Sequence, residues 1–270
     1  MCCMWKRLTA VALALVLSAA LILPGSASVL MVNGQNLWQN TLARPEGGTT
    51  YVSLRVVANV LAPHAEVSWS QGTAWVRGNG VTLKAVPGQT YITVNDRALY
   101  VAKGVKLENG RVMVPIRVLA EALGGTVAWS RTEGITLTVG SGVPGPAPYT
   151  SDELYWMSRI ISAESQGEPL KGKLAVGTVI LNRVASDQFP STIYDVIFDK
   201  KWGVQFSPTI NGMIYQEPTA ESVLAAKLCL EGARVAGDSL YFLNPEIAEN
   251  FWIMENREFV MTIGRHWFYR

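Results

Sequence analysis

The second half of the chain is organised around one stretch, YWMSRIISAESQGEP, which spans residues 155–169. Apolar residues recur through it at the i, i+3, i+4, i+7 spacing of an amphipathic helix. Gly167 and Pro169 should end this helix, since glycine suits the turn after a helix and proline cannot continue one. The apolar positions are Leu154, Met157, Ile160 and Ile161.

Glu164 lies three, four and seven residues after members of this apolar set, so its carboxylate should project from the apolar face. Loss of hydration there favours the protonated form and raises the pKa. A carboxylic acid that donates a proton near neutral pH needs such surroundings. The alternative is a structural glutamate paired with Arg159 or Arg183.

Composition indicates a globular protein with a leader. The 270 residues are 49% hydrophobic and 16% charged, and this length predicts about two domains. Residues 1–27 have a short basic start at Lys6 and Arg7, an apolar run over 8–23, and small residues up to Ala27. This pattern predicts a secretory signal peptide, with an uncleaved membrane anchor as the alternative. We expect no other contact with a membrane.

The charge and the cysteine content further limit the classes of protein to which the chain can belong. Residues 28–143 carry a net charge of +4 and residues 144–270 a net charge of −4. The basic half favours an anionic polymer such as a cell wall, but it is too weakly charged to indicate nucleic-acid binding. Without the leader, Cys229 is the only cysteine, which excludes an intramolecular disulfide and suggests a buried small hydrophobe.

Residues 29–139 contain an internal repeat. VSLRVVA at 52–58 matches VPIRVLA at 114–120, and VSWS at 67–70 matches VAWS at 127–130. In each unit we predict a β-rich run, a helix (54–61 and 116–123) and a strand that contains tryptophan. Further strands are predicted over 81–86, 91–101 and 135–139. The fold class is therefore α+β, with a duplicated small α+β module in front of a mainly helical domain.

This duplicated pattern, over residues 28–139, resembles the copper amine oxidase N-terminal-like domain, which implies a wall-binding or spacer module. His64 is its single histidine, and we expect an ordinary loop residue rather than a copper ligand. Trp69, Trp75 and Trp129 are expected to pack in the core, with stacking on sugar faces as the alternative.

Residues 140–150 are rich in glycine and proline and predict an interdomain linker. In the second domain, residues 151–270, Thr150 or Ser151 can cap the first helix. Further helices are predicted over 170–185, 192–198 and 219–233, with a loop over 199–216 and an extended segment over 237–243. A short helical domain with one acid on a buried face is similar to a lysozyme-like arrangement.

The second domain resembles the SleB-like cell wall hydrolases, the spore cortex-lytic family. The resemblance rests on short motifs whose order and spacing along the domain match those of the family. SQ at 165–166 stands where the family more often carries Ala-Arg, which removes a charge beside the acid. The motifs are AESQGEP (163–169), AV (175–176), VILNRV (179–184), FP (189–190), QFS (205–207), LYF (240–242), NP (244–245) and IGRHWFY (263–269).

The resemblance implies cleavage of peptidoglycan glycan strands at the MurNAc-GlcNAc bond, with Glu164 as the catalytic acid, in spore cortex lysis during germination. It also implies a lytic transglycosylase reaction, a related fold, and secretion to the cell wall or spore envelope. No metal or cofactor is expected, and an accessory germination protein is a candidate partner. Our candidates for binding the substrate are Gln205, Phe206, Ser207, Tyr241 and Asn244, because sugar rings stack on aromatic faces and need polar groups at their rims.

Three alternatives remain. A hydrolytic muramidase needs a second carboxylate, and Glu168 lies four residues after Glu164, although its neighbour Pro169 favours a turn role. A wall-binding protein without catalysis needs no acid. A zinc amidase is disfavoured because the chain has two histidines, His64 and His266, and we expect His266 to be packed. The remaining acids are expected at the surface: Glu217, Asp238, Glu246 and Glu255.

Overall fold

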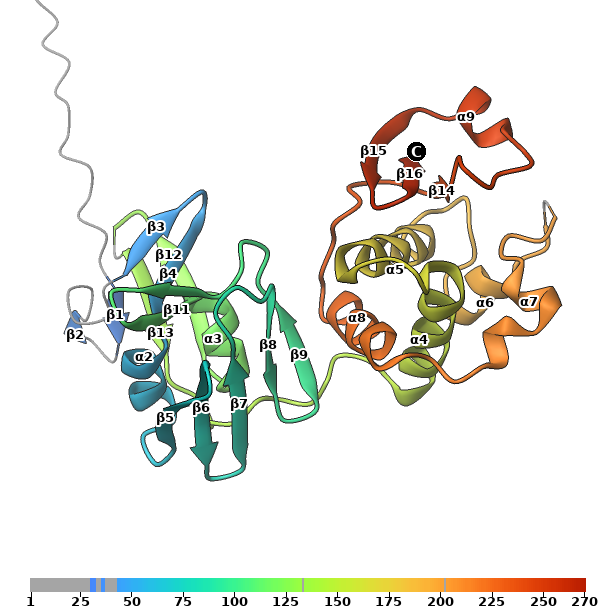
Figure 1. Cartoon of the computed structure of the whole chain (residues 1–270). Helices are drawn as coiled ribbons and strands as arrows, with labels where there is room; N and C mark the ends of the chain where they lie inside the picture. The colour runs from blue at the N-terminus through green and yellow to red at the C-terminus, as the bar shows by residue number, and fades with distance from the viewer. Residues whose placement is uncertain (1–29, 33–34, 37–42, 133, 202) are drawn as a thin grey trace, which may run out of the picture.

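The computed structural model describes residues 30–32, 35–36, 43–132, 134–201 and 203–270, and the predicted signal peptide lies outside this part of the chain. The described chain is an α+β protein, with a β-rich half followed by a mainly helical half (Figure 1). The predicted fold class is therefore confirmed. Among the helices in these ranges, none is long and apolar enough to cross a membrane.

The β-rich half contains the predicted repeat as two units, each a hairpin, a helix and a second hairpin. The first unit comprises β3 (Arg44–Glu46), β4 (Thr49–Ser53), α2 (Leu54–Leu61), β5 (Glu66–Ser70) and β6 (Thr73–Gly78). The second comprises β10 (Lys106–Glu108), β11 (Arg111–Pro115), α3 (Ile116–Ala122), β12 (Thr126–Ser130) and β13 (Gly134–Thr138).

The two units meet along β4 and β11, which pair antiparallel. Val52 pairs with Val114, its own counterpart 62 residues later in the repeat. Equivalent residues face each other in this way only beside a twofold axis, so a local pseudo-twofold axis relates the units. The same axis relates the two ion pairs that join the edge strands of this sheet, Arg44–Glu108 and Lys106–Glu46.

Three more strands extend the β5–β6 hairpin into a five-stranded sheet: β7 (Val81–Ala85), β8 (Tyr91–Val94) and β9 (Arg97–Tyr100). The strand predicted over 91–101 is thus two strands, split by a turn at Asn95, whose φ is 48°. The Asn95 Oδ1 accepts a hydrogen bond from the Thr82 amide at 2.8 Å, which holds this turn. Separately, β1 (Leu30–Val32) joins β13 in parallel and β2 (Gln35–Asn36) in antiparallel.

The structure corrects the prediction for two tryptophans. Trp69 and Trp129 are 49% and 66% exposed, so core packing was wrong for them. They lie on β5 and β12, which are edge strands of their sheets. Trp75, one strand further in, is partly buried, and the Arg77 guanidinium lies 3.7 Å from its ring centre. His64 occupies an exposed turn, as expected.

The helical half begins where the sequence predicts. Thr150 caps the first helix in a capping box with Glu153, because each residue's side chain accepts the other's backbone N–H. Two short helices occur inside the predicted loop over 199–216, too short to leave a periodic signal. The helices are α4 (Ser151–Ser165), α5 (Leu170–Val184), α6 (Ile193–Phe198), α7 (Pro208–Asn211), the 3₁₀ turn η1 (Met213–Tyr215), α8 (Ala220–Leu230) and α9 (Trp252–Asn256).

Helix α5 is central, as its nearly continuous apolar surface predicts: Leu174, Val176 and Ile180 are completely or almost completely buried. It approaches α8 closely at Gly177, where an added Cβ would lie 2.6 Å from the Cys229 Sγ. Cys229 is fully buried, as predicted, and burial raises the pKa of its thiol to about 12.

A three-stranded antiparallel sheet, in the order β14-β16-β15, closes the domain beside α5. Its apolar side buries Ile263 and Phe268 in one cluster with Ala175 and Val179 of α5. The extended segment predicted over 237–243 contains the whole first strand, but the other two strands lack a clear alternating pattern and were not predicted. The strands are β14 (Tyr241–Leu243), β15 (Phe259–Ile263) and β16 (His266–Tyr269).

The two halves touch through β9 and α8. Arg97 donates to both carboxylate oxygens of Glu231, at 2.7 and 2.6 Å, and to Glu121 at 2.6 Å. Ala98 is buried against the helical core. Residues 140–150, which run between β13 and α4, form neither helix nor strand. The β8–β9 hairpin therefore lies against the helical half.

Candidate functional site

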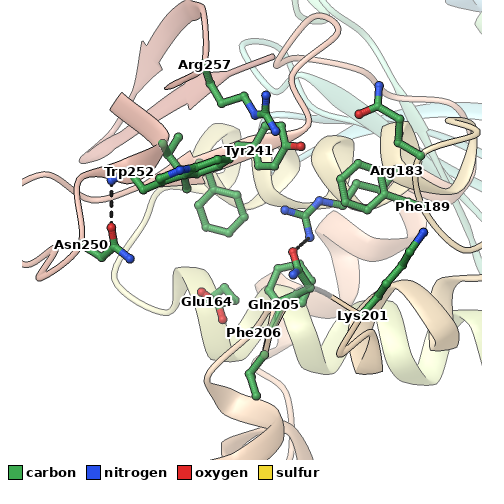
Figure 2. A pocket seen from close by; sticks show the side chains of 14 residues that line it. Glu164, Arg183, Phe189, Lys201, Gln205, Phe206, Tyr241, Asn250, Trp252 and Arg257 are labelled. Atoms are coloured by element: carbon green, nitrogen blue, oxygen red, sulfur yellow. Dashed lines mark hydrogen bonds between the residues drawn. The ribbon is translucent and has the colours of Figure 1, made fainter. Parts of the chain in front are cut away.

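The helical half contains a cleft of about 870 Å³. Segments far apart in the sequence form it: the end of α4, the end of α5 and the loop after it, the loop before α7, strand β14 and the segment around α9. Figure 2 shows Glu164 facing the open space, with Trp252, Tyr241 and Arg257 along the opposite side. Among the described residues that line the cleft, Glu164 is the only carboxylate.

Glu164 sits in the last turn of α4, one turn after Ile160 and Ile161, both of which are completely buried. Among the described residues, none makes an ion pair or hydrogen bond with its carboxylate. Burial raises the pKa of Glu164 to about 7, although the positive charge of Arg183 opposes this shift. The predicted direction of the pKa shift is confirmed.

The alternative of a glutamate paired with arginine does not describe this site. Arg159 pairs instead with Glu217, at 3.0 Å. Arg183 donates to the Leu240 carbonyl at 2.7 Å and to the Gln205 Oε1 at 3.3 Å. The carboxylate of Glu164 therefore feels a nearby cation without being bound by it.

Aromatic rings surround Arg183. Its guanidinium carbon lies 4.7, 5.2 and 5.5 Å from the ring centres of Phe189, Phe206 and Tyr241. Burial lowers the pKa of Arg183 to about 10, so it remains charged at neutral pH. A second guanidinium, that of Arg257, lies over the Tyr241 ring, 4.7 Å from the ring centre.

Arg257 extends this row to Trp252, whose ring centre lies 4.8 Å from the guanidinium. Trp252 is 48% exposed, and its backbone N–H donates to the Asn250 side chain at 2.9 Å. One side of the cleft is thus a row of alternating aromatic rings and guanidinium groups. Such a surface offers flat apolar faces for sugar rings and donors for their oxygens.

The structure brings together three of the five residues predicted to bind substrate: Gln205, Phe206 and Tyr241 line the cleft. Ser207 and Asn244 do not. Ser207 is exposed at the start of α7, where its carbonyl accepts from the helix. The Asn244 Oδ1 accepts the Glu246 amide at 3.0 Å and stabilises the turn after β14.

Glu168 has a different environment from Glu164. It is only 7% exposed and lies outside the cleft, and both its oxygens accept the Arg265 amide at 3.3 Å. This contact connects the end of the α4 region to the turn of the β15–β16 hairpin. The turn role predicted for Glu168 therefore agrees with the structure.

His266 is packed, as expected, with 8% of its surface exposed and its ring 5.3 Å from that of Phe242. Burial lowers the pKa of its imidazole. The structure describes no group of three or more His, Cys, Asp or Glu side chains placed to hold a metal ion. The acids expected at the surface are exposed: Glu217, Asp238, Glu246 and Glu255.

Sequence reasoning missed the segment that carries Asn250, Trp252 and Arg257. No periodicity marks it, and its place at the cleft depends on the pairing of β14 with β16. The one available signal was composition, since a tryptophan and an arginine close together suit a carbohydrate surface.

These features define a class: an α+β protein whose helical half, as far as its residues are described, holds one unpaired, half-buried acid in an aromatic cleft. A family model described as cell wall hydrolase matches residues 167–269, and one described as copper amine oxidase N-terminal domain matches residues 31–138. The chain belongs to the cell wall hydrolase family. The first match begins three residues after Glu164, so it does not include the acid.

Individual proteins agree with this membership. A spore cortex-lytic enzyme of Bacillus cereus is 36% identical over 123 residues, which are 46% of this chain and 46% of that protein. The cell wall hydrolase CwlJ of Oceanobacillus iheyensis is 31% identical over 100 residues, which are 35% of this chain and 70% of that protein. The chain thus spans about half the length of the spore cortex-lytic enzyme.

Among solved structures, the catalytic domain of the germination-specific lytic transglycosylase SleB from Bacillus anthracis is 35% identical. The match covers 47% of this chain and all of that one, with a TM-score of 0.43.

Proposed function

We propose that the chain cleaves the glycan strands of peptidoglycan and that Glu164 is its general acid. One observation carries this proposal: among the described residues, the cleft lining presents a single carboxylate, which has no bonding partner there and a pKa of about 7. A general acid is most effective when its pKa lies near the working pH. An ordinary exposed glutamate would be ionised at that pH and could not donate a proton.

The single carboxylate favours a lytic transglycosylase over a hydrolase. Glycoside hydrolases normally use two carboxyl groups, one as acid and one as base or nucleophile. In our proposal Glu164 gives its proton to the glycosidic oxygen as the bond to the muramic acid anomeric carbon breaks. The 6-hydroxyl of the same muramic acid then attacks that carbon, and its proton passes to Glu164. The product carries a 1,6-anhydro ring, and the acid returns to its starting form.

The opposite side of the cleft suits the same substrate. Trp252 and Tyr241 offer ring faces on which sugars can stack, and Gln205 lies within reach of sugar hydroxyls. Arg183 stays charged beside Glu164 and can stabilise the carboxylate that forms after proton transfer.

The names of the relatives indicate which layer of peptidoglycan is the substrate. Spore cortex-lytic enzymes match this domain, so we propose the spore cortex or the wall as the site of action, during germination. The predicted signal peptide over residues 1–27 supports export to that layer.

The test is digestion of purified cortex and vegetative peptidoglycan by residues 28–270, with the new ends identified by mass spectrometry. Glu164→Gln is the inactivating variant, and Glu246→Gln is its matched control, an exposed glutamate outside the cleft. We expect 1,6-anhydromuramic ends with the unmodified chain and the control, and none with Glu164→Gln. Reducing ends would instead indicate water as the nucleophile and a second carboxylate.

A further inference from the structure

The β-rich half has two surface pockets that the repeat places at equivalent positions. The first, of about 400 Å³, is lined by Arg55 of α2 and Trp69 of β5. The second, of about 500 Å³, is lined by Arg117 of α3 and Trp129 of β12. The two arginines are 62 residues apart and the two tryptophans 60 apart, which are the offsets of the repeat itself.

Each pocket combines both units of the repeat. The strand start at Gly110 and Arg111, from the second unit, lines the first pocket. The matching strand start at Gly48 and Thr49, from the first unit, lines the second. The pseudo-twofold axis between β4 and β11 exchanges these strands, so it also exchanges the pockets. Two independent surface hollows would not share this relation.

The tryptophans are presented rather than packed. Trp69 and Trp129 expose 49% and 66% of their surface, although a large indole normally seeks burial. Trp75, which lines neither pocket, is partly buried beneath Arg77. Exposed tryptophan faces at two repeat-related positions offer stacking platforms for sugar rings.

The charge of both pockets is positive. Arg55 and Arg111 line the first, Lys103 and Arg117 line the second, and no aspartate or glutamate occurs among the described residues that line either. The Arg55 side chain donates to the Val67 carbonyl at 2.7 Å, which holds its guanidinium near Trp69. The basic lining favours an anionic ligand, and the tryptophans favour one built from sugars.

We propose that each repeat unit carries a binding site for a wall glycan strand with carboxylate groups, namely peptidoglycan. In each site the tryptophan face stacks on a sugar ring, and the basic side chains bind a carboxylate of the stem peptides that the strand carries. Two sites on one domain can engage one polymer together, which raises the apparent affinity above that of either site. The domain then holds the chain on its substrate independently of cleavage at Glu164.

The test is sedimentation of purified Glu164→Gln protein with insoluble peptidoglycan from which teichoic acids have been removed. We expect Trp69→Ala and Trp129→Ala each to weaken binding about tenfold, and the double variant to weaken it more than either. Arg55→Ala together with Arg117→Ala should weaken binding and reduce its dependence on salt. Arg131→Ala, an exposed arginine outside both pockets, should bind like the parent protein.

Three results would overturn the proposal. The double tryptophan variant could bind like its parent while it keeps the parent's circular dichroism and melting temperature. Chitin, a neutral glycan, could bind as tightly as peptidoglycan, which would remove the role of the basic residues. Purified teichoic acid could bind while stripped peptidoglycan does not, which would assign the pockets to phosphate. The Glu164→Gln background keeps all of these results separate from any failure of the proposed cleavage.

Discussion

Glu164 and Glu168 are four residues apart, and both are withdrawn from water, yet they have opposite environments. Glu168 is more buried, but its oxygens accept a backbone amide of the β15–β16 turn. Glu164 faces the cleft and has no such partner in the described part of the chain. Burial raises the pKa of Glu164 to about 7. The comparison teaches that a hydrogen-bond partner, more than the depth of burial alone, distinguishes a structural carboxylate from one that can exchange a proton.

The backbone explains how neighbours diverge in this way. Helix α4 ends at Ser165, and the Glu168 amide then donates to the Ser165 carbonyl at 3.0 Å in a turn. Glu168 therefore leaves the face that carries Glu164 and points to Gly264, where an added Cβ would collide with its carboxylate. If the helix had continued for one more turn, the two acids would lie on one face.

The largest expected effect belongs to Glu164→Gln, which keeps the shape of the side chain but removes the proton. Cleavage should fall by about 10²–10⁴-fold, the contribution of a general acid. Initial rates of release of soluble fragments from peptidoglycan measure this change. If the variant keeps more than about a tenth of the activity, Glu164 is not the acid.

The pH dependence of cleavage should be the next largest effect. Since Glu164 must be protonated to donate, the rate should fall about tenfold for each pH unit above its pKa of about 7. The measurement is kcat/KM between pH 5 and 9 on soluble glycan fragments. A rate that rises steadily with pH above 7 would mean that the ionised form is the active one.

The same titration affects stability, with a definite sign. The folded pKa of about 7 lies above the ordinary value of 4.5, so the folded protein binds more protons than the unfolded chain. Relative to Glu164→Gln, the stability of the unmodified protein should be highest below pH 4.5 and should decline as the pH rises through 7. Because the cleft admits water, we expect a difference on the order of 2 kcal/mol, measured by urea unfolding.

Removal of the cation beside Glu164 should move the pH profile. Arg183 lowers the pKa of Glu164, so Arg183→Met should shift the alkaline limb to higher pH, by on the order of half a unit to one unit. Arg183→Lys retains the charge and is the control. It loses the guanidinium contacts but should leave the limb near its original position. A downward shift in Arg183→Met would show that the arginine does not act on the acid through its charge.

The smallest expected effect on cleavage is that of Glu168→Gln. The rate per folded molecule should change by less than about twofold, while the free energy of unfolding should fall by about 1–2 kcal/mol, since a charge-assisted hydrogen bond becomes a neutral one. Urea unfolding and initial rates on one preparation measure both quantities. Loss of cleavage in a stably folded Glu168→Gln protein would make Glu168 the second carboxylate of a hydrolase.

Much of this comparison could be predicted from local sequence. The apolar spacing around Glu164 placed the acid on the buried face of α4, and the repeat gave the two-unit plan of the β-rich half. The cap is predicted to within one residue, Thr150 or Ser151, because capping depends on residues within one turn, and the structure has Thr150. Each of these features depends on a pattern of residues that can be read directly from the sequence.

The rest depends on contacts between distant segments. The β14–β16 pairing brings Tyr241 beside Arg257 and Trp252, and no local pattern predicts that meeting. Ser207 and Asn244 were chosen by their motifs, yet both face local turns. The exposure of Trp69 and Trp129 follows from the strand order in two sheets, which is again a tertiary property.

The most direct test of the account is the titration of Glu164 itself. Carbon-13 NMR of carboxyl-labelled protein, with Glu164→Gln to assign the signal, gives the pKa of this one side chain. The account predicts a midpoint near 7, well above the ordinary glutamate value of 4.5. A midpoint at or below 4.5 would mean that the carboxylate is ionised at neutral pH, and the proposed acid would have no proton to give.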